Sequence, residues 1–216
     1  MIQLYSYFRS STSYRVRIAL NLKELDYAIE TVNLAAGDQV KEAFLRINPA
    51  GGVPVLQIGG RSMMQSVAII EWLDEVYGGA PLLPQDPDKR FIVREAASMI
   101  ATELHAPLNL TVLQYLKKDM SQDQASVDRW YHHWLAAKLK PLEHKLEQRA
   151  TGDYLVDAPG LFECVLIPQL YNARRFAFDL ESFPRMRRIE TACAHHPAFI
   201  KAHPSGQPDT PEGHRS

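Results

Sequence analysis

The chain has 216 residues, of which 46% are hydrophobic, so it can bury one large core or two smaller ones. Lysine and arginine together number 24 against 25 acidic residues, which leaves no overall charge to recruit nucleic acid, a membrane surface or an acidic partner. No apolar run has the length of a membrane span and no signal-peptide pattern is present, so we expect an unprocessed protein outside the membrane. Cys164 and Cys193 lack metal-ligand spacing, which favours free buried thiols and a cytoplasmic location.

The first part of the chain predicts a strand, a helix and a second strand. Residues 2–7 are aromatic and branched, and Val16, Ala19 and Leu20 then recur at helical spacing after a polar run that ends at Ser13, a ready N-cap. We expect the charged side chains in this helix, which are Arg15, Arg17 and Lys23, on its other faces. Residues 28–34 return to strand character, and this order favours a parallel pair of strands.

A hairpin and a further helix complete this unit. An amphipathic stretch over 39–46 ends at the turn sequence 48–52, and Gly59-Gly60 predicts an antiparallel hairpin between 55–58 and 61–64. Apolar residues at helical spacing over 66–77 predict the helix that follows. The result is an α/β domain with a mixed four-stranded sheet over residues 1–78.

The rest of the chain has the pattern of an all-α domain. Glycine and proline concentrate over 79–88, which predicts a linker, and residues 89–216 give helical signals almost throughout. The expected helices cover 88–118, 123–149 and 161–177, with shorter pieces from 185 onward. Pro168 predicts a kink or a later start in the third of these, and the polar tail from His203 is expected to be loosely held.

Three short motifs suggest a site for an anionic ligand, although each has a simpler interpretation when taken alone. The hydroxyl run Ser10–Ser13 at a helix N-terminus would favour a thiolate or carboxylate, or would merely cap the helix. Val53-Pro54 before a strand is ordinarily a trans turn. Gln65-Ser66 would bind a carboxylate at the next helix N-terminus, or would serve as its cap.

Taken together, these motifs resemble those of the zeta-class glutathione transferase family. Residues 5–20, YSYFRSSTSYRVRIAL, resemble the zeta signature SSCS followed by an aromatic residue and RVRIAL. Further similar pieces are NPAGGVPVL, QSVAIIEWLDE, LLPQDP, ARRFAFDL and HPSGQPDTP, so the resemblance runs from end to end. It implies a thioredoxin-like N-terminal domain, an all-helical C-terminal domain, glutathione as cofactor and a homodimer.

The resemblance also implies roles for individual residues. It makes Ser10, Ser11, Thr12 and Arg9 the catalytic candidates, and Arg9 and Arg175 the groups that bind the carboxylates of the substrate. It implies a cis bond before Pro54. The implied contacts to glutathione come from Ser10, Ser11, Thr12, Gln39, Val53, Gln65, Ser66, Asn109 and Thr111.

Three departures from the family pattern stand out. Thr12 replaces the signature cysteine, which keeps a hydroxyl donor and removes a reactive thiol. Leu108 and Thr111 replace a polar residue and a cation, so contacts to glutathione and to a substrate carboxylate are altered there. Gly160 and Glu163 replace the usual hydroxyl and aspartate of a helix cap. The histidines show no metal-ligand spacing, so we expect no metal.

The implied reaction is a cis–trans isomerisation of maleylacetoacetate to fumarylacetoacetate, in which a glutathione thiolate adds to the double bond, the bond rotates and the thiolate leaves. Lowering a thiol pKa by about two units would increase its ionisation roughly 25-fold, but lost nucleophilicity would cancel about eight-fold of this. Positioning must therefore contribute more than activation. The alternatives are a maleylpyruvate isomerase, a transferase acting on α-halo acids, and a non-catalytic binding module of the same fold.

Overall fold

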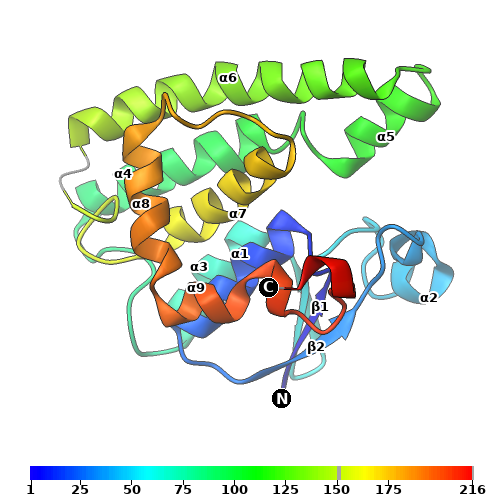
Figure 1. Cartoon of the computed structure of the whole chain (residues 1–216). Helices are drawn as coiled ribbons and strands as arrows, with labels where there is room; N and C mark the ends of the chain where they lie inside the picture. The colour runs from blue at the N-terminus through cyan, green and yellow to red at the C-terminus, as the bar shows by residue number, and fades with distance from the viewer. Residues whose placement is uncertain (150–151, 216) are drawn as a thin grey trace. The chain divides into compact units, whose positions relative to one another are not determined.

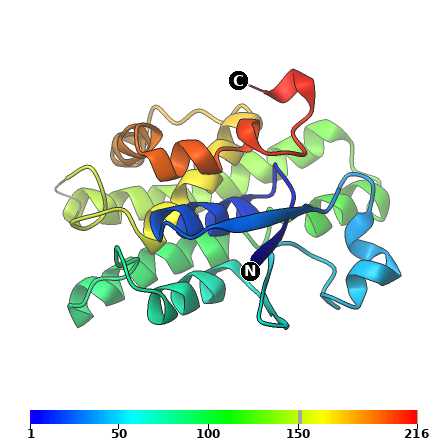
Figure 2. The ribbon, with the colours of Figure 1, turned by 90° about the horizontal axis from the view of Figure 1, so that it is seen from below.

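The computed structural model describes residues 1–149 and 152–215, and these form two compact units. The first contains Met1–Leu83 together with the chain from Ala194 onward, and the second contains Pro84–Cys193. The sequence-based limits of 1–78, 79–88 and 89–216 had grouped the last residues with the helices. In the structure they belong to the unit that contains the sheet, and α9 (Pro197–Ala202) lies against α1 (Ser11–Leu22) (Figures 1 and 2).

The first unit is built on a four-stranded mixed sheet in the order β2-β1-β3-β4. β1 (Ile2–Ser6) pairs parallel with β2 (Tyr27–Thr31) and antiparallel with β3 (Val55–Ile58), which in turn pairs antiparallel with β4 (Arg61–Met64). Gly59 and Gly60 both have positive φ, 56° and 79°, as a two-residue hairpin turn requires. The predicted parallel pair and the predicted hairpin are both confirmed.

Helix α1 is buried on nearly all sides, because it packs against α3 (Ser66–Val76) and α9, and its Arg17 side chain donates to the Ser6 hydroxyl of β1. Three charged residues, Arg15 and Arg17 in this helix and Lys23 at its C-cap, are therefore buried, with 2%, 0% and 6% of their surface exposed. The expectation that they occupy faces apart from the core is wrong. Each is buried with hydrogen-bond acceptors that come from distant parts of the first unit.

The opposite face of the sheet is covered by a short helical segment. The ring of Tyr5 in β1 lies edge-on to the ring of Phe44 in α2 (Glu42–Leu45), and Phe44 belongs to a small core cluster with Val32 and Val55. The predicted amphipathic stretch 39–46 forms only the 3-10 turn η1 (Asp38–Val40) and this single turn of α-helix.

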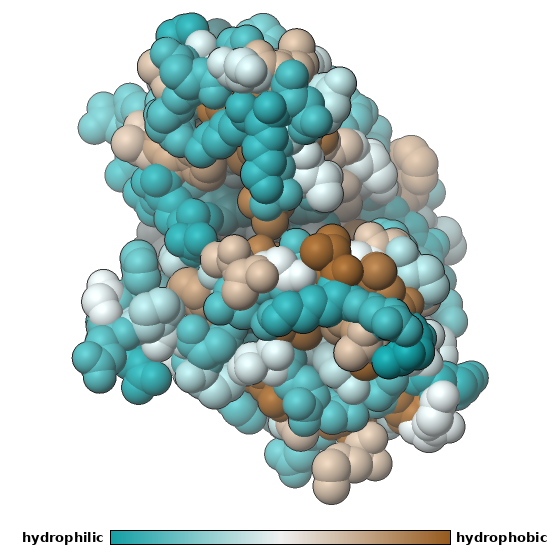
Figure 3. Space-filling model, turned by 90° about the vertical axis from the view of Figure 1, so that its right-hand side faces the viewer, coloured by the Kyte–Doolittle hydropathy of each residue, from teal (hydrophilic) through white to brown (hydrophobic). Residues whose placement is uncertain are grey.

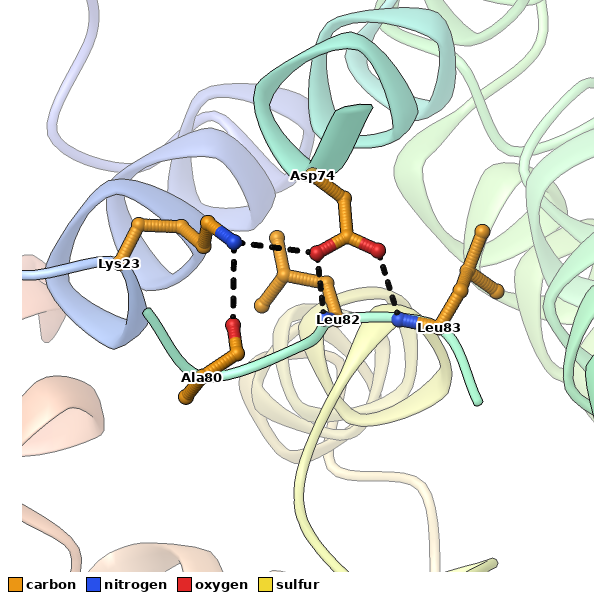
Figure 4. Close-up of polar contacts among 5 residues, drawn as sticks. All are labelled: Lys23, Asp74, Ala80, Leu82 and Leu83. Atoms are coloured by element: carbon orange, nitrogen blue, oxygen red, sulfur yellow. Dashed lines mark hydrogen bonds and ion pairs between the residues drawn. The ribbon is translucent and has the colours of Figure 1, made fainter. Parts of the chain in front are cut away.

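A buried ion pair fixes residues 80–83, the last residues before the second unit. The Lys23 ammonium lies 3.1 Å from a carboxylate oxygen of Asp74 in α3 and donates to the carbonyl oxygen of Ala80 (Figure 4). The same carboxylate accepts hydrogen bonds from the backbone N–H groups of Leu82 and Leu83. Residues 80–83 are thereby fixed to α1 and α3.

The C-terminal segment is well packed, and the expectation of a loose tail from His203 is wrong for residues 203–210. Gln207 and Thr210 are only 5% and 3% exposed. The Gln207 amide donates to the carbonyl oxygens of Lys201 and His203, and the Thr210 hydroxyl donates to that of Pro204. This segment is rich in proline and polar residues, and it is ordered by hydrogen bonds from its side chains to nearby backbone carbonyl oxygens.

The second unit is helical, and its described residues contain no strand. Its helices are α4 (Pro87–Ser98), the π-helical η2 (Met99–Leu104), α5 (Leu110–Lys118), α6 (Gln124–Arg149), α7 (Leu161–Arg175) and α8 (Pro184–Ala194). The expected helix over 88–118 is thus interrupted by η2 and a turn. Helix α7 begins at Leu161 and continues through Pro168, so the later start considered from sequence is wrong.

The fold is of the thioredoxin-like plus all-α class that the sequence predicted. Among the described residues, no helix combines the length and apolarity that crossing a membrane requires. One face of the molecule is drawn in Figure 3, where hydrophilic residues predominate and apolar residues form small groups among them.

Candidate active site

The hydroxyl run lies where β1 leads into α1. Ser10 is the N-cap of α1, because its side chain accepts a hydrogen bond from the backbone N–H of Ser13 at 3.2 Å. The sequence-based choice of Ser13 as the cap is wrong, since Ser13 lies inside the helix and is fully buried. Ser10 and Thr12 remain partly exposed, whereas Ser11 is buried. The N-terminal amides and the positive end of the helix dipole lie beside these two hydroxyl groups.

The hydroxyl groups of Ser10 and Thr12 form a directed chain of hydrogen bonds. Thr12 Oγ1 donates to the carbonyl oxygen of Val53 at 2.8 Å, which uses its only proton. In the 2.9 Å contact between Ser10 Oγ and Thr12 Oγ1, Ser10 is therefore the donor. A ligand anion at this helix terminus would compete with Thr12 for the Ser10 proton.

Val53 and Pro54 lie directly across from this terminus and are joined by a cis peptide bond. The cis bond implied by the family resemblance is confirmed. Pro54 is buried and leads into β3, and Val53 is partly exposed. Val53 thus lies two residues before β3 begins, and its carbonyl oxygen is fixed by the Thr12 hydroxyl.

Gln65 and Ser66 form the start of α3. Gln65 has φ 70° and ψ 105°, an unusual conformation for a residue other than glycine, and its side chain does not cap the helix. The Ser66 hydroxyl is buried and accepts a hydrogen bond of 3.3 Å from the Arg15 guanidinium. This helix N-terminus therefore combines backbone amides without a side-chain cap and a buried cation, an arrangement suited to a carboxylate.

Two further candidates of the first unit are Gln39 and Arg9. The side-chain oxygen of Gln39 in η1 is buried and has no hydrogen-bond partner among the described residues, so it is available to a donor on a ligand. Arg9 is partly exposed, and its guanidinium carbon lies 5.6 Å from the centroid of the Phe8 ring. Stacking on this ring restrains the Arg9 side chain beside the serines.

The remaining candidate residues belong to the second unit. Asn109 is the N-cap of α5, and its side-chain oxygen accepts from the backbone N–H and the hydroxyl of Thr111. Leu108, which replaces a polar residue of the family pattern, is 6% exposed and belongs to the core. Arg175 is exposed in the last turn of α7, where it donates to the side-chain oxygen of Asn172. The structure thus brings together the serine run, Val53 and Pro54, and it separately joins Ser66 to Arg15.

Sequence reasoning missed three residues that form hydrogen bonds to the site. Arg15 donates to the Ser66 hydroxyl, and Arg17 donates to the carbonyl oxygen of Phe8 in the turn before Ser10. Asp209 accepts from the backbone N–H of Phe8 in the same turn. The signal for the arginines in the sequence was two cations among the mostly apolar residues 14–20. No group of three or more histidine, cysteine, aspartate or glutamate side chains suited to a metal ion occurs within residues 1–149 and 152–215.

A helix N-terminus rich in hydroxyl groups, a neighbouring cis-proline and a thioredoxin-like sheet joined to a helical unit define a glutathione transferase fold. Residues 9–76 match the family described as glutathione S-transferase, N-terminal domain. A maleylacetoacetate isomerase of Pseudomonas aeruginosa is 43% identical over 97% of this chain and 99% of its own.

Solved structures are similar as well. A holo maleylpyruvate isomerase, described as a bacterial zeta-class glutathione transferase, has a TM-score of 0.95 at 40% identity, over 97% of this chain and all of its own. A maleylacetoacetate isomerase of Methylobacterium extorquens AM1 with bound malonate and glutathione has a TM-score of 0.93 at 34% identity, over 97% and 99% of the two chains. The chain therefore belongs to the zeta-class family of maleylacetoacetate and maleylpyruvate isomerases. It is an isomerase that uses glutathione.

Proposed function

We propose that the chain isomerises maleylacetoacetate to fumarylacetoacetate and that Ser10 is the central residue of its site. The observation that carries this proposal is the Ser10 hydroxyl at the N-terminus of α1, where Thr12 orients it and the Val53 carbonyl lies next to it. When bound, glutathione supplies the thiolate that adds to the cis double bond and leaves after the bond has rotated.

The residues of the first unit fit glutathione. Its thiol would lie at the α1 N-terminus near Ser10, Ser11 and Thr12, where hydroxyl groups and amides stabilise a negative charge. The Val53 backbone would pair with the cysteinyl amide groups. One carboxylate would lie at the start of α3, where Gln65 and Ser66 offer amides and a hydroxyl above Arg15.

Three further residues would add polar contacts to glutathione. Gln39 has a buried acceptor without a partner among the described residues, which fits an amide or ammonium donor of the tripeptide. Asn109 and Thr111 would add contacts from the start of α5. The Asn109 oxygen already accepts from Thr111, and the amide nitrogen contacts Nε2 of His105 at 3.4 Å, so the second N–H of that nitrogen is the group that would face the ligand. Leu108 is buried and would make no polar contact.

Two arginines would orient the substrate, which carries two carboxylates. Arg9 is restrained by the Phe8 ring and lies next to Ser10 in the chain, while Arg175 is exposed at the end of α7. A guanidinium binds a carboxylate through two parallel hydrogen bonds, so it fixes direction as well as position. The Ser10 hydroxyl and the α1 amides would stabilise the negative charge that develops in the transition state.

Maleylpyruvate is the main alternative substrate, because it shares the cis double bond next to a carboxylate. Thr111 in place of a cation leaves this alternative open, since it removes one charge that a carboxylate of either dianion could use. A transferase acting on α-halo acids needs the same helix terminus. A non-catalytic binding module would have no physical need for Ser10, Val53-Pro54 and Gln65-Ser66 together.

A direct assay separates these functions. We expect isomerase activity that depends on glutathione, with a higher kcat/KM for maleylacetoacetate than for maleylpyruvate or for dichloroacetate conversion. A preference for either of the other two would replace the proposed substrate. Failure of the protein to bind immobilised glutathione would support the non-catalytic module instead.

We also propose that the protein is a cytoplasmic homodimer. The family resemblance supports the dimer, and the two buried free thiols, Cys164 and Cys193, are compatible with a reducing compartment. Light scattering on a size-exclusion column should give twice the mass of the chain. A single-chain mass at micromolar concentration would contradict the dimer.

A further inference from the structure

The turn that precedes Ser10 is held almost entirely through its backbone. The carbonyl oxygen of Tyr7 accepts from the backbone N–H of Ser10 at 3.0 Å, and that of Phe8 accepts from the Arg17 guanidinium at 3.0 Å. The N–H of Phe8 donates to Oδ2 of Asp209 at 2.8 Å, across 201 residues of sequence. Because this turn carries Arg9 and ends in the N-cap Ser10, its geometry sets the positions of both side chains.

Asp209 is itself fixed independently of the turn. Its neighbour Thr210 donates to the carbonyl oxygen of Pro204, and Gln207 donates to those of Lys201 and His203. Both neighbours are buried. The Asp209 carboxylate therefore belongs to a segment that its own hydrogen bonds hold in place, and it serves as a fixed acceptor for the Phe8 N–H.

Arg17 joins the same two parts of the chain from the other side. Its Nε donates to the carbonyl oxygen of Ala202 at 3.0 Å, and its terminal nitrogens donate to the Ser6 hydroxyl and to the Tyr7 and Phe8 carbonyl oxygens. The turn is thus held by a donor on Arg17 and by an acceptor on Asp209. Phe8 is only 3% exposed, so water would not readily replace either group.

From these contacts we infer that Asp209 is a positioning residue for the reaction: it holds the Tyr7–Ser10 turn so that Ser10 and Arg9 face the reacting groups. The inference rests on the proposed roles of Ser10 and Arg9. Without the carboxylate, the Phe8 N–H would be buried and unpaired, and the turn would shift to reach another acceptor. A displacement of about 1 Å is enough to lower a rate by about 100-fold in well-ordered active sites.

The test compares Asp209→Ala, Asp209→Asn and Glu212→Ala. Asparagine keeps a carbonyl oxygen for the Phe8 N–H, while Glu212 is exposed three residues further on and controls for the loss of one negative charge. We expect Asp209→Ala to lower kcat at least about tenfold, and to change the glutathione dissociation constant by less than about threefold. The other two variants should stay within about twofold of the wild type.

Hydrogen exchange provides a readout that does not depend on the substrate. In the free protein, Asp209→Ala should speed amide exchange in the peptide covering residues 7–11, and Asp209→Asn should not. If wild-type isomerase activity is absent, the proposed function fails, but the exchange comparison still tests whether the hydrogen bond from Phe8 N–H to Asp209 holds the turn. If Asp209→Ala does not fold, Asp209→Glu takes its place, because the longer side chain keeps the charge and displaces the acceptor.

Two results would overturn the inference. One is a kcat for Asp209→Ala equal to that of Glu212→Ala, with unchanged exchange at residues 7–11. The other is an equal loss in Asp209→Ala and Asp209→Asn, which would show that the charge, and not the acceptor for Phe8, is what the site requires.

Discussion

Thr12 donates a hydrogen bond from its hydroxyl to the carbonyl oxygen of Val53 across 2.8 Å, and it thereby ties the start of α1 to the residue before the cis-proline. The same hydroxyl accepts from Ser10. Thr12 thus orients both the side chain and the backbone group that are proposed to face glutathione. Thr12, in place of the signature cysteine, makes these contacts with a stronger hydrogen-bonding group than a thiol.

We predict that Ser10→Ala lowers kcat by about 100-fold, because it removes a donor to the negative charge that forms in the transition state. Glutathione affinity should change less, since the α1 amides and the α3 terminus remain. Steady-state kinetics and calorimetric titration with glutathione measure the two effects.

Loss of the helix cap has to be separated from this effect. Ser10→Ala also removes the acceptor for the Ser13 N–H, at a cost of about 1 kcal/mol in stability. Ser10→Asn keeps a capping acceptor, so it should restore the thermal stability without restoring kcat. Thr12→Ala removes the group that orients Ser10 but keeps the Ser10 hydroxyl, so we expect a smaller loss of kcat; an equal loss would argue against a special role for Ser10.

Neutralising either substrate-binding arginine should raise KM for the dianionic substrate. Arg9→Gln and Arg175→Gln each remove a charge-assisted pair, so we expect KM to rise about tenfold or more. Arg46→Gln is the matched control, because Arg46 is exposed and pairs with Glu42 on α2. Unchanged kinetics in both variants would eliminate the proposed carboxylate contacts.

Local signals in the sequence predicted most elements of the fold. Gly59 and Gly60 predicted the hairpin because both adopt positive φ, a property of the residues themselves. The choice of Ser10 as N-cap was not predictable in this way. Ser10 to Ser13 are all hydroxyl residues able to cap a helix, and the register is fixed in part by the Thr12 bond to Val53, 41 residues away.

The buried charges were missed for the same physical reason. Arg17 is stabilised by the carbonyl oxygen of Ala202, and Arg15 by the hydroxyl of Ser66, and neither acceptor is close in sequence. Asp209 lies in a segment whose composition indicated a loose tail. Its bond to Phe8 spans the chain, so only the folded structure reveals it.

The Lys23–Asp74 pair should contribute strongly to stability. Lys23→Met leaves the Asp74 carboxylate with two backbone donors and no cation, and we expect a loss of about 3 kcal/mol in the free energy of unfolding. Asp74→Ala should cost more, because the Leu82 and Leu83 N–H groups and Lys23 all lose their acceptor. Urea unfolding of each variant measures these changes.

The double variant supplies the control. If the two side chains act as a unit, Lys23→Met combined with Asp74→Ala will destabilise the protein by less than the sum of the single changes. Additive losses would mean that the Asp74 bonds to Leu82 and Leu83 stabilise the protein independently of Lys23 (Figure 4).

The native protein should be inert to thiol reagents. Cys164 and Cys193 have no exposed surface, and burial raises the pKa of the Cys193 thiol, so neither forms an accessible thiolate. A colorimetric disulfide reagent should titrate no thiol in native protein and two after denaturation. Thr12→Cys should add one reactive thiol at the partly exposed α1 terminus, and its modification should block glutathione binding. Reaction of the native wild-type chain would contradict the burial of both cysteines.

Burial of Glu163 should make the stability of the protein depend on pH. The side chain is fully buried, and burial raises its pKa above the ordinary value of 4.5, although the N–H groups of Leu155 and Gly160 both donate to the carboxylate. Between 4.5 and this raised pKa, the folded protein binds more protons than the unfolded chain. The contribution of Glu163 to the free energy of unfolding therefore falls as pH rises through this window and then levels off.

The variant Glu163→Gln isolates this component, because glutamine does not titrate and the other acidic groups are the same in both proteins. The difference in unfolding free energy, wild type minus variant, should fall as pH rises from about 4.5, as the sign of the linkage relation requires. Urea unfolding at half-unit steps of pH measures it. An exposed control, Glu212→Gln, should give a much flatter difference. A rising difference for Glu163→Gln would mean that the two backbone donors outweigh burial and lower the pKa instead.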